Sequence, residues 1–178
     1  LKGRLGKGVK IRFVFRVDCD PGELGDLYLV LETPDRFRIW VNGVEVERRD
    51  AGWWIDISFR MLPVKRLVRR GVNVVELEPL RECELENCYL IGDFGVYRSG
   101  DGFIVGPERE RVKPFNLVEE GYPFYAGRIV LSREFELGEA GKGWIALFEG
   151  LSCIVARVTV NGCEAGIICW PPHEVDIS

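Results

Sequence analysis

Several residue types and motifs are missing from this sequence, and each absence narrows the range of functions. Among the 178 residues there is no glutamine, one methionine and a single histidine, His173. A serine or cysteine nucleophile commonly needs a histidine base, and no Gly-x-Ser-x-Gly motif occurs, so a nucleophilic triad is disfavoured. The longest apolar runs contain only a few residues, which is too short for a transmembrane helix.

Charge of one dominant sign is also missing. The net charge is -4, with acidic and basic residues interspersed, so there is no general electrostatic attraction to nucleic acid or to anionic lipid. A basic stretch at residues 60–70 lacks interleaved aromatic side chains, and we interpret it as a solvated face. We therefore expect neither nucleic acid nor a membrane as a partner.

The composition that is present is typical of a globular protein, with 11% aromatic and 29% charged residues. The scarcity of glutamine and methionine beside many charged residues is the tendency of thermophile proteins. The six cysteines do not indicate a cellular compartment, because free thiols and intracellular disulfides both fit such a source.

Short segments with alternating apolar residues predict an all-β fold, since few segments keep a helical period for three turns. Glycine, proline and asparagine separate these segments, as expected for turns between strands. We expect strands at residues 9–17, 27–31, 37–41, 44–48, 53–59, 74–77, 88–91, 94–97, 103–105, 128–137, 144–149, 155–160 and 175–178.

One pattern occurs twice, at residues 37–58 and 154–178. Each copy has a β-branched strand, an Asn-Gly pair and, at nearly the same spacing, an Asp-Ile-Ser sequence. Asn-Gly between two strands predicts a tight hairpin, because both residues tolerate positive φ. The aspartates of the two Asp-Ile-Ser sequences, Asp56 and Asp176, are expected to hold a turn or an adjacent backbone amide rather than to act in catalysis.

The repeat suggests three parts: a first β-sandwich unit at residues 1–80, connecting strands and an aromatic loop at 81–127, and a second unit at 128–178. After the first copy the sequence continues into a strand at residues 71–77, whereas the second copy has no counterpart of it. A sheet without that strand would have an unpaired edge, so we expect either that the second unit is truncated and the chain is part of a longer polypeptide, or that a strand from elsewhere fills the gap.

The matching stretches YAGRIVLSREFEL, WIALFEG, ARVTVNGCEAG and WPPHEVDIS lie within residues 125–178. This region resembles the sugar-binding, galactose-binding-like jelly-roll domain of family two glycoside hydrolases. The resemblance implies a non-catalytic accessory β-sandwich that supports a catalytic domain of the same parent chain and contacts carbohydrate. It also implies that the catalytic carboxylates lie on that separate domain. Structural calcium is common in jelly rolls of this resemblance, but no local acidic motif in the sequence specifies a calcium site.

A sugar site needs exposed aromatic faces, which stack on the C–H faces of the ring, beside hydrogen-bonding groups. Trp53 and Trp54 are adjacent in a predicted strand, so their side chains should point to opposite faces. The candidate carbohydrate-binding residues are Trp53, Trp54, Tyr122, Tyr125, Trp170 and His173.

Two other interpretations stay open beside the accessory role. One is a free-standing carbohydrate-binding module, which fails if Trp53, Trp54 and Trp170 are all fully buried. The other is a structural or oligomerisation domain that uses the open edge of the second unit. A zinc site at Cys163, Cys169 and His173 is disfavoured, because the spacing is unlike that of a paired-knuckle site. No cofactor is expected.

Overall fold

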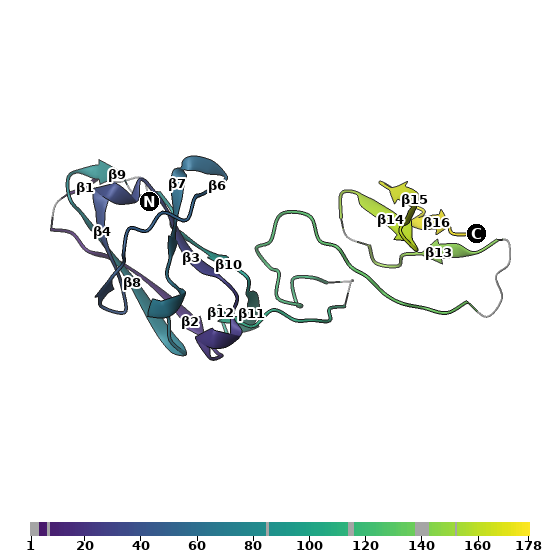
Figure 1. Ribbon diagram of the computed structural model, residues 1–178, viewed down its shortest axis with the longest axis horizontal. Coiled ribbons are helices and arrows are strands. Elements are labelled where there is room, and N and C mark those ends of the chain that lie inside the picture. Colours follow the sequence, from purple (N-terminus) through teal and green to yellow (C-terminus); the bar gives the residue numbers. More distant parts are fainter. Residues whose placement is uncertain (1–3, 7, 85, 114–115, 138–142, 152) are drawn as a thin grey trace. The chain divides into compact units, whose positions relative to one another are not determined.

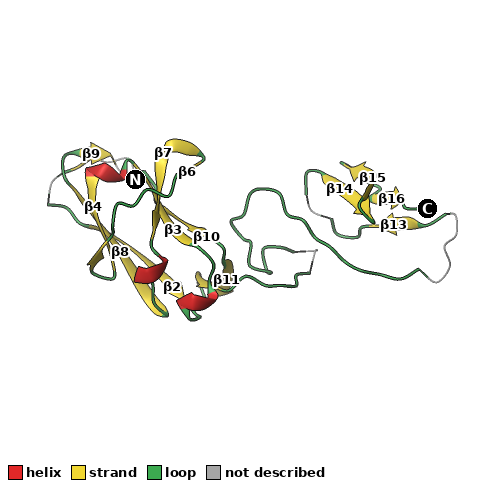
Figure 2. Cartoon of the chain, viewed as in Figure 1, coloured by secondary structure: helices red, strands yellow, loops and turns green. Residues whose placement is uncertain are grey.

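The computed structural model describes residues 4–6, 8–84, 86–113, 116–137, 143–151 and 153–178. The protein is all-β, as predicted, and the helical segments of the described chain are three short 3-10 turns at Pro21–Glu23, Pro34–Arg36 and Lys65–Leu67 (Figure 2). The chain divides into two compact units. The first contains Leu1–Glu110 and Gly121–Pro123, and the second contains Arg111–Glu120 and Phe124–Ser178.

The first unit contains two main sheets, an arrangement consistent with a β-sandwich. A four-stranded sheet has the order β10-β3-β7-β6, formed by Tyr89–Gly92, Leu27–Glu32, Asp56–Pro63 and Trp53–Trp54. A six-stranded sheet has the order β11-β12-β2-β8-β4-β5, formed by Gly95–Ser99, Gly102–Gly106, Ile11–Val17, Gly71–Pro79, Phe37–Val41 and Val44–Glu45. A separate short pair joins β1 (Arg4–Leu5) to β9 (Cys83–Glu84).

Alternating side chains of both sheets form one hydrophobic core. On β4, Phe37, Ile39 and Val41 point inward and are only 1%, 3% and 1% exposed. This alternation is the expected pattern for a strand with one buried face. The same core includes residues of the four-stranded sheet and of the connecting turns, namely Leu27, Leu29, Leu31, Leu62, Val64 and Val68.

Strand β8 lies in the middle of the six-stranded sheet and pairs antiparallel with a strand on each side (Figure 1). Its register places Val75 opposite both Phe13 of β2 and Val41 of β4. Because β8 satisfies the backbone groups of both neighbours, β2 and β4 belong to one sheet only through it.

The second unit contains two antiparallel pairs. Strand β14 (Ala156–Val160) pairs with β15 (Cys163–Ile168), and β13 (Ile145–Leu147) pairs with β16 (Glu174–Asp176). The predicted Asn-Gly hairpins are confirmed in both copies. Asn42 and Gly43 have φ of 52° and 81°, and Asn161 and Gly162 have 50° and 82°. Positive φ at both central residues is the geometry of a type I′ hairpin turn.

Residues 81–127, expected to connect the two units, contribute strands to both sheets of the first. Strand β10 joins the edge of the four-stranded sheet beside β3, and the β11–β12 hairpin extends the six-stranded sheet. Strand β12 meets β2 in a short parallel contact at Val105 and Val17. The structure thus places this section within the first unit up to Glu110.

Two strand predictions are wrong. Residues 128–137 have the alternation of a strand but form none, because no strand among the described residues satisfies their backbone groups. The single strand predicted at residues 53–59 is divided into β6 and β7, because Ile55 adopts a φ of 65° and reverses the chain. Strand β7 then continues to Pro63, into the basic stretch at residues 60–70.

Leu77 of β8 is fully buried, so its substitution tests how much this strand contributes to stability. We expect Leu77→Ala to lower the free energy of unfolding by about 2–5 kcal/mol, because it removes buried methyl groups and leaves a cavity. Val72→Ala on the same strand is the control: its side chain is exposed, and a change of about 1 kcal/mol or less is expected. Equal losses in urea denaturation would contradict the central position of β8.

Candidate functional site

An open cleft of about 380 Å³ lies on the first unit. This volume is within the range of about 300–1,000 Å³ that is usual for small-ligand sites. The 3-10 turn at Pro34–Arg36, the loop after β5 and strand β7 surround it. The lining residues are Thr33, Pro34, Asp35, Arg48, Asp50, Ile57, Ser58, Arg60 and Leu62.

Arg48 forms one polar wall of the cleft. Its Nη2 donates to the backbone oxygen of Phe37 at 2.8 Å, and its Nη1 lies 3.4 Å from Oδ1 of Asp35. The backbone contact fixes the guanidinium at the start of β4. The Asp35 side chain is 87% exposed, so the carboxylate retains free oxygen positions toward the solvent.

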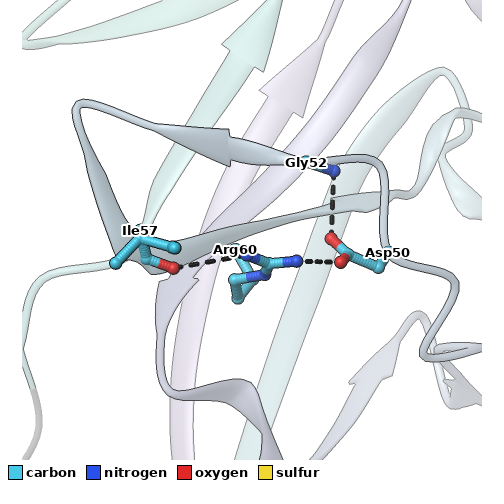
Figure 3. A network of polar contacts seen from close by, with 4 residues as sticks. All are labelled: Asp50, Gly52, Ile57 and Arg60. Atoms are coloured by element: carbon cyan, nitrogen blue, oxygen red, sulfur yellow. Dashed lines mark hydrogen bonds and ion pairs between the residues drawn. The ribbon is translucent and has the colours of Figure 1, made fainter.

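Arg60 and Asp50 are a second arginine–aspartate pair in the lining of the cleft (Figure 3). Nη2 of Arg60 forms an ion pair with Oδ2 of Asp50, and Oδ1 of Asp50 accepts a hydrogen bond from the backbone N–H of Gly52 at 3.0 Å. Nη1 of Arg60 also points to the backbone oxygen of Ile57, at 3.4 Å. A guanidinium with several partners is held in one orientation, which suits it to a defined acceptor.

Ser58, which lines the cleft, is hydrogen-bonded to Asp56 at the start of β7. Oδ1 of Asp56 accepts hydrogen bonds from the Ser58 hydroxyl at 2.6 Å and from the Ser58 backbone N–H at 2.8 Å. These two donors, the hydroxyl first, lower the pKa of the Asp56 carboxyl below its ordinary value. The predicted role of Asp56, holding an adjacent backbone amide, is confirmed.

Asp176 repeats this arrangement in the second unit, where its Oδ1 accepts from the Ser178 backbone N–H at 2.9 Å. The Ser178 side chain and backbone N–H lower the pKa of the Asp176 carboxyl. The Ser178 hydroxyl oxygen in turn accepts from the backbone N–H of Gly143 at 2.7 Å and from that of Trp144 at 3.1 Å. The same role predicted for Asp176 is therefore confirmed as well.

Trp53 is the predicted sugar-binding residue that the structure places beside this cleft. It lies opposite Arg60 in the β6–β7 pair, and directly opposed residues of an antiparallel pair share one face. The Trp53 side chain is 55% exposed. Trp54 is half-buried and its ring packs against Tyr89, with 5.2 Å between the ring centroids. One tryptophan is therefore open to solvent and its neighbour is packed, as the alternation predicts.

Neither Trp53 nor any other predicted sugar-binding residue belongs to the lining of the cleft. Tyr122 donates its hydroxyl hydrogen to Glu108 at 2.7 Å, and Tyr125 donates to the backbone oxygen of Arg128 at 2.9 Å. In the second unit, Trp170 is 75% exposed and lines a smaller pocket of about 170 Å³. His173 is half-buried, and its backbone oxygen accepts from the N–H of Phe148 at 2.8 Å.

The sequence disfavours a zinc site at Cys163, Cys169 and His173. Cys163 and Cys169 are exposed free thiols, and in the part of the chain that the structure describes no three His, Cys, Asp or Glu side chains gather closely enough to hold a metal ion. This includes Cys163, Cys169 and His173 as a set.

Sequence reasoning missed the four charged residues that define the cleft, Asp35, Arg48, Asp50 and Arg60. They come from separate elements, and only the pairing of β6 with β7 and the path of the loop after β5 bring them together. The one local signal is the charged run at residues 47–50, which lies between the Asn-Gly hairpin and the tryptophan pair.

Ser58→Ala removes the hydroxyl donor to Asp56, so the pKa of the Asp56 carboxyl should rise toward its ordinary value. NMR titration of side-chain carboxyl carbons measures this shift. Since a lowered native pKa stabilises the fold above the unfolded pKa, the variant should be less stable at neutral pH. That difference should disappear as the pH falls through the native pKa of Asp56, and a difference that persists in acid would contradict the assignment.

The cysteines should react at very different rates. Burial raises the pKa of the Cys88 thiol to about 11, and burial followed by nearby carboxylates raises that of Cys19. At pH 8 we expect iodoacetamide to modify Cys153, Cys163 and Cys169, which are exposed, well before Cys19, Cys83 and Cys88. Mass spectrometry of the timed reaction checks this, with all six equally reactive in denaturant. Early modification of Cys88 in the native protein would refute its burial.

The described residues include no helix with the length and hydrophobicity that a bilayer crossing requires. In comparisons with known proteins, no protein-family model, no curated protein and no solved structure matches the chain.

Proposed function

We propose that the first unit binds carbohydrate in the cleft beside Trp53 and that the protein is a non-catalytic accessory β-sandwich of a glycoside hydrolase. The observation that carries the binding proposal is that two arginine–aspartate pairs line one cleft of about 380 Å³ and that the exposed Trp53 pairs opposite the lining residue Arg60.

The chemistry of the cleft suits a sugar. Arg48 and Arg60 offer N–H donors in fixed orientations, and Asp35 and Asp50 offer acceptors, so both kinds of hydroxyl hydrogen bond can form. Ile57 is exposed at the rim and adds apolar surface. Trp53 on the same face as Arg60 supplies the flat apolar surface on which the C–H side of a pyranose stacks.

The finer part of the proposal rests on the resemblance of residues 125–178 to the jelly-roll domain of family two glycoside hydrolases. In that arrangement the catalytic carboxylates belong to a separate domain of the same parent chain. The arginine pairing of Asp35 and Asp50 supports a binding role for the cleft, because each carboxylate helps to orient a guanidinium.

Titration with a panel of mono- and polysaccharides tests the binding proposal, with calorimetry and intrinsic tryptophan fluorescence as readouts. We expect saturable binding that Trp53→Ala weakens by about tenfold or more, which corresponds to about 1.4 kcal/mol. Trp170→Ala is the matched control, because Trp170 is an exposed tryptophan outside the cleft. Circular dichroism confirms that both variants fold.

Two results would overturn the proposal. If no sugar of the panel binds, the cleft has another ligand or none. If Trp170→Ala removes binding while Trp53→Ala leaves it unchanged, the sugar site belongs to the second unit and the first unit is a scaffold.

A further inference from the structure

Asn42, at the tip of the first Asn-Gly hairpin, bonds strand β8 through both its backbone and its side chain. Its backbone N–H donates to the oxygen of Val74 at 2.8 Å, and its Oδ1 accepts from the N–H of Val74 at 3.0 Å. Its Nδ2 donates to Oδ1 of Asn73 at 2.8 Å and to the backbone oxygen of Leu67 at 2.8 Å. The hairpin tip therefore recognises a strand that carries asparagine at one defined position.

The second unit repeats the hairpin that makes these contacts. Val160 pairs with Cys163 across Asn161-Gly162, as Val41 pairs with Val44 across Asn42-Gly43. The φ angles of the two asparagines differ by only 2°. Strand β14 thus presents the same backbone edge as β4, with Asn161 in the place of Asn42.

No strand corresponding to β8 lies on this edge among the described residues. Strand β14 pairs with β15 alone, whereas β4 pairs with β5 on one side and β8 on the other. Asn161 is exposed, and no hydrogen bond of its side chain is found in the described part of the second unit, whereas Asn42 is half-buried and has three side-chain bonds.

The apolar side chains around β14 are also incompletely covered. Alternate residues of β14 match the inward-facing residues of β4 when the two strands are counted back from their Asn-Gly turns. The β4 residues Phe37, Ile39 and Val41 are buried, whereas their counterparts Ala156, Val158 and Val160 are half-buried. Residues 128–137, which have the sequence pattern of a strand, are almost all exposed, and Val130 reaches 85%. In the first unit, β2 precedes the first hairpin in the same way and is completed by β8.

We propose that the free edge of β14, with Asn161 at its end, is an acceptor for one added β-strand of the chemistry of residues 71–77. This chemistry is Gly-x-Asn followed by alternating aliphatic and acidic residues. Addition of a strand to an open edge is a common mode of peptide recognition, in which the main chain gives affinity and the side chains give register.

Charge supports this occupant. In the first unit Arg38 of β4 lies opposite Glu78 of β8, and Arg12 of β2 pairs with Glu76 of β8 at 2.9 Å. Strand β14 carries Arg157 at the position of Arg38. Arg157 pairs with Glu164 of β15 at 3.3 Å and its side chain is 68% exposed, so an acidic residue in the added strand would meet a cation that it shares with Glu164. A second copy of the chain, with β14 against β14, would instead bring two arginines into the same interface.

A synthetic peptide with the sequence GVNVVELEP, residues 71–79, probes this acceptor on the full chain. We expect saturable binding by fluorescence polarisation and new protection from hydrogen exchange at residues 156–161 and 128–137. A peptide in which its asparagine is replaced by alanine should bind at least about tenfold more weakly, because the Asn161 side chain loses its partner.

Asn161→Gly is the matched variant of the protein. Glycine keeps the positive φ that the hairpin needs, so the turn should survive while the side-chain contact is lost. We expect the same loss of affinity, about tenfold or more, as with the altered peptide. The combined change should cost little more than either change alone, because both remove one contact.

Several results would overturn the proposal. These are no saturable binding, equal affinity for the asparagine and alanine peptides, or exchange protection confined to the first unit. Sedimentation that shows a dimer without peptide, with β14 protected, would assign the edge to a second copy instead. This inference does not rest on the sugar site, because the acceptor lies in the second unit and its assay uses no carbohydrate.

Discussion

The paired asparagines Asn42 and Asn73 join the hairpin of β4 and β5 to the central strand of the larger sheet. Asn73 is fully buried, yet its side chain is satisfied by Asn42, by both backbone groups of Arg69 and by the oxygen of Gly71. A buried amide without partners costs about 1–3 kcal/mol. Only one register of β8 satisfies the buried side-chain amide of Asn73. These contacts therefore fix the alternation that buries Val75 and Leu77, and this alternation forms the core between the two sheets.

The cleft depends on a different constraint, the sharp reversal at Ile55. A β-branched residue at positive φ is uncommon and costs about 1–3 kcal/mol. The reversal allows β6 to fold back on β7, which sets Trp53 opposite Arg60 and brings the loop with Asp50 against the same strand. Backbone strain and polar side chains thus coincide at the candidate sugar site, while the core of the same unit is regular.

Sequence reasoning succeeded where the determinants are local. Alternation located β2, β3, β4 and β8, and Asn-Gly predicted both hairpins, because these patterns act over a few residues. It failed at residues 53–59, since nothing in the sequence marks Ile55 as left-handed, and at residues 128–137, since alternation permits a strand but only a partner completes one. Of the candidate site, Trp53 could be predicted from its type, whereas the cleft residues depend on long-range pairing.

The two Asp-Ile-Ser sequences fold in the same way but occupy opposite ends of a strand. Asp56 begins β7, whereas Asp176 ends β16, and each accepts the N–H of the serine two residues on. Because the aspartate and its serine partner lie within three residues, this hydrogen bond does not depend on pairing with a neighbouring strand, and the same turn can form at different positions in a fold. The side-chain hydrogen bonds of Asn42 span more than twenty residues of sequence, so they form only where the fold brings these segments together. The two Asp-Ile-Ser sequences therefore have the same local conformation but lie at different positions in the fold.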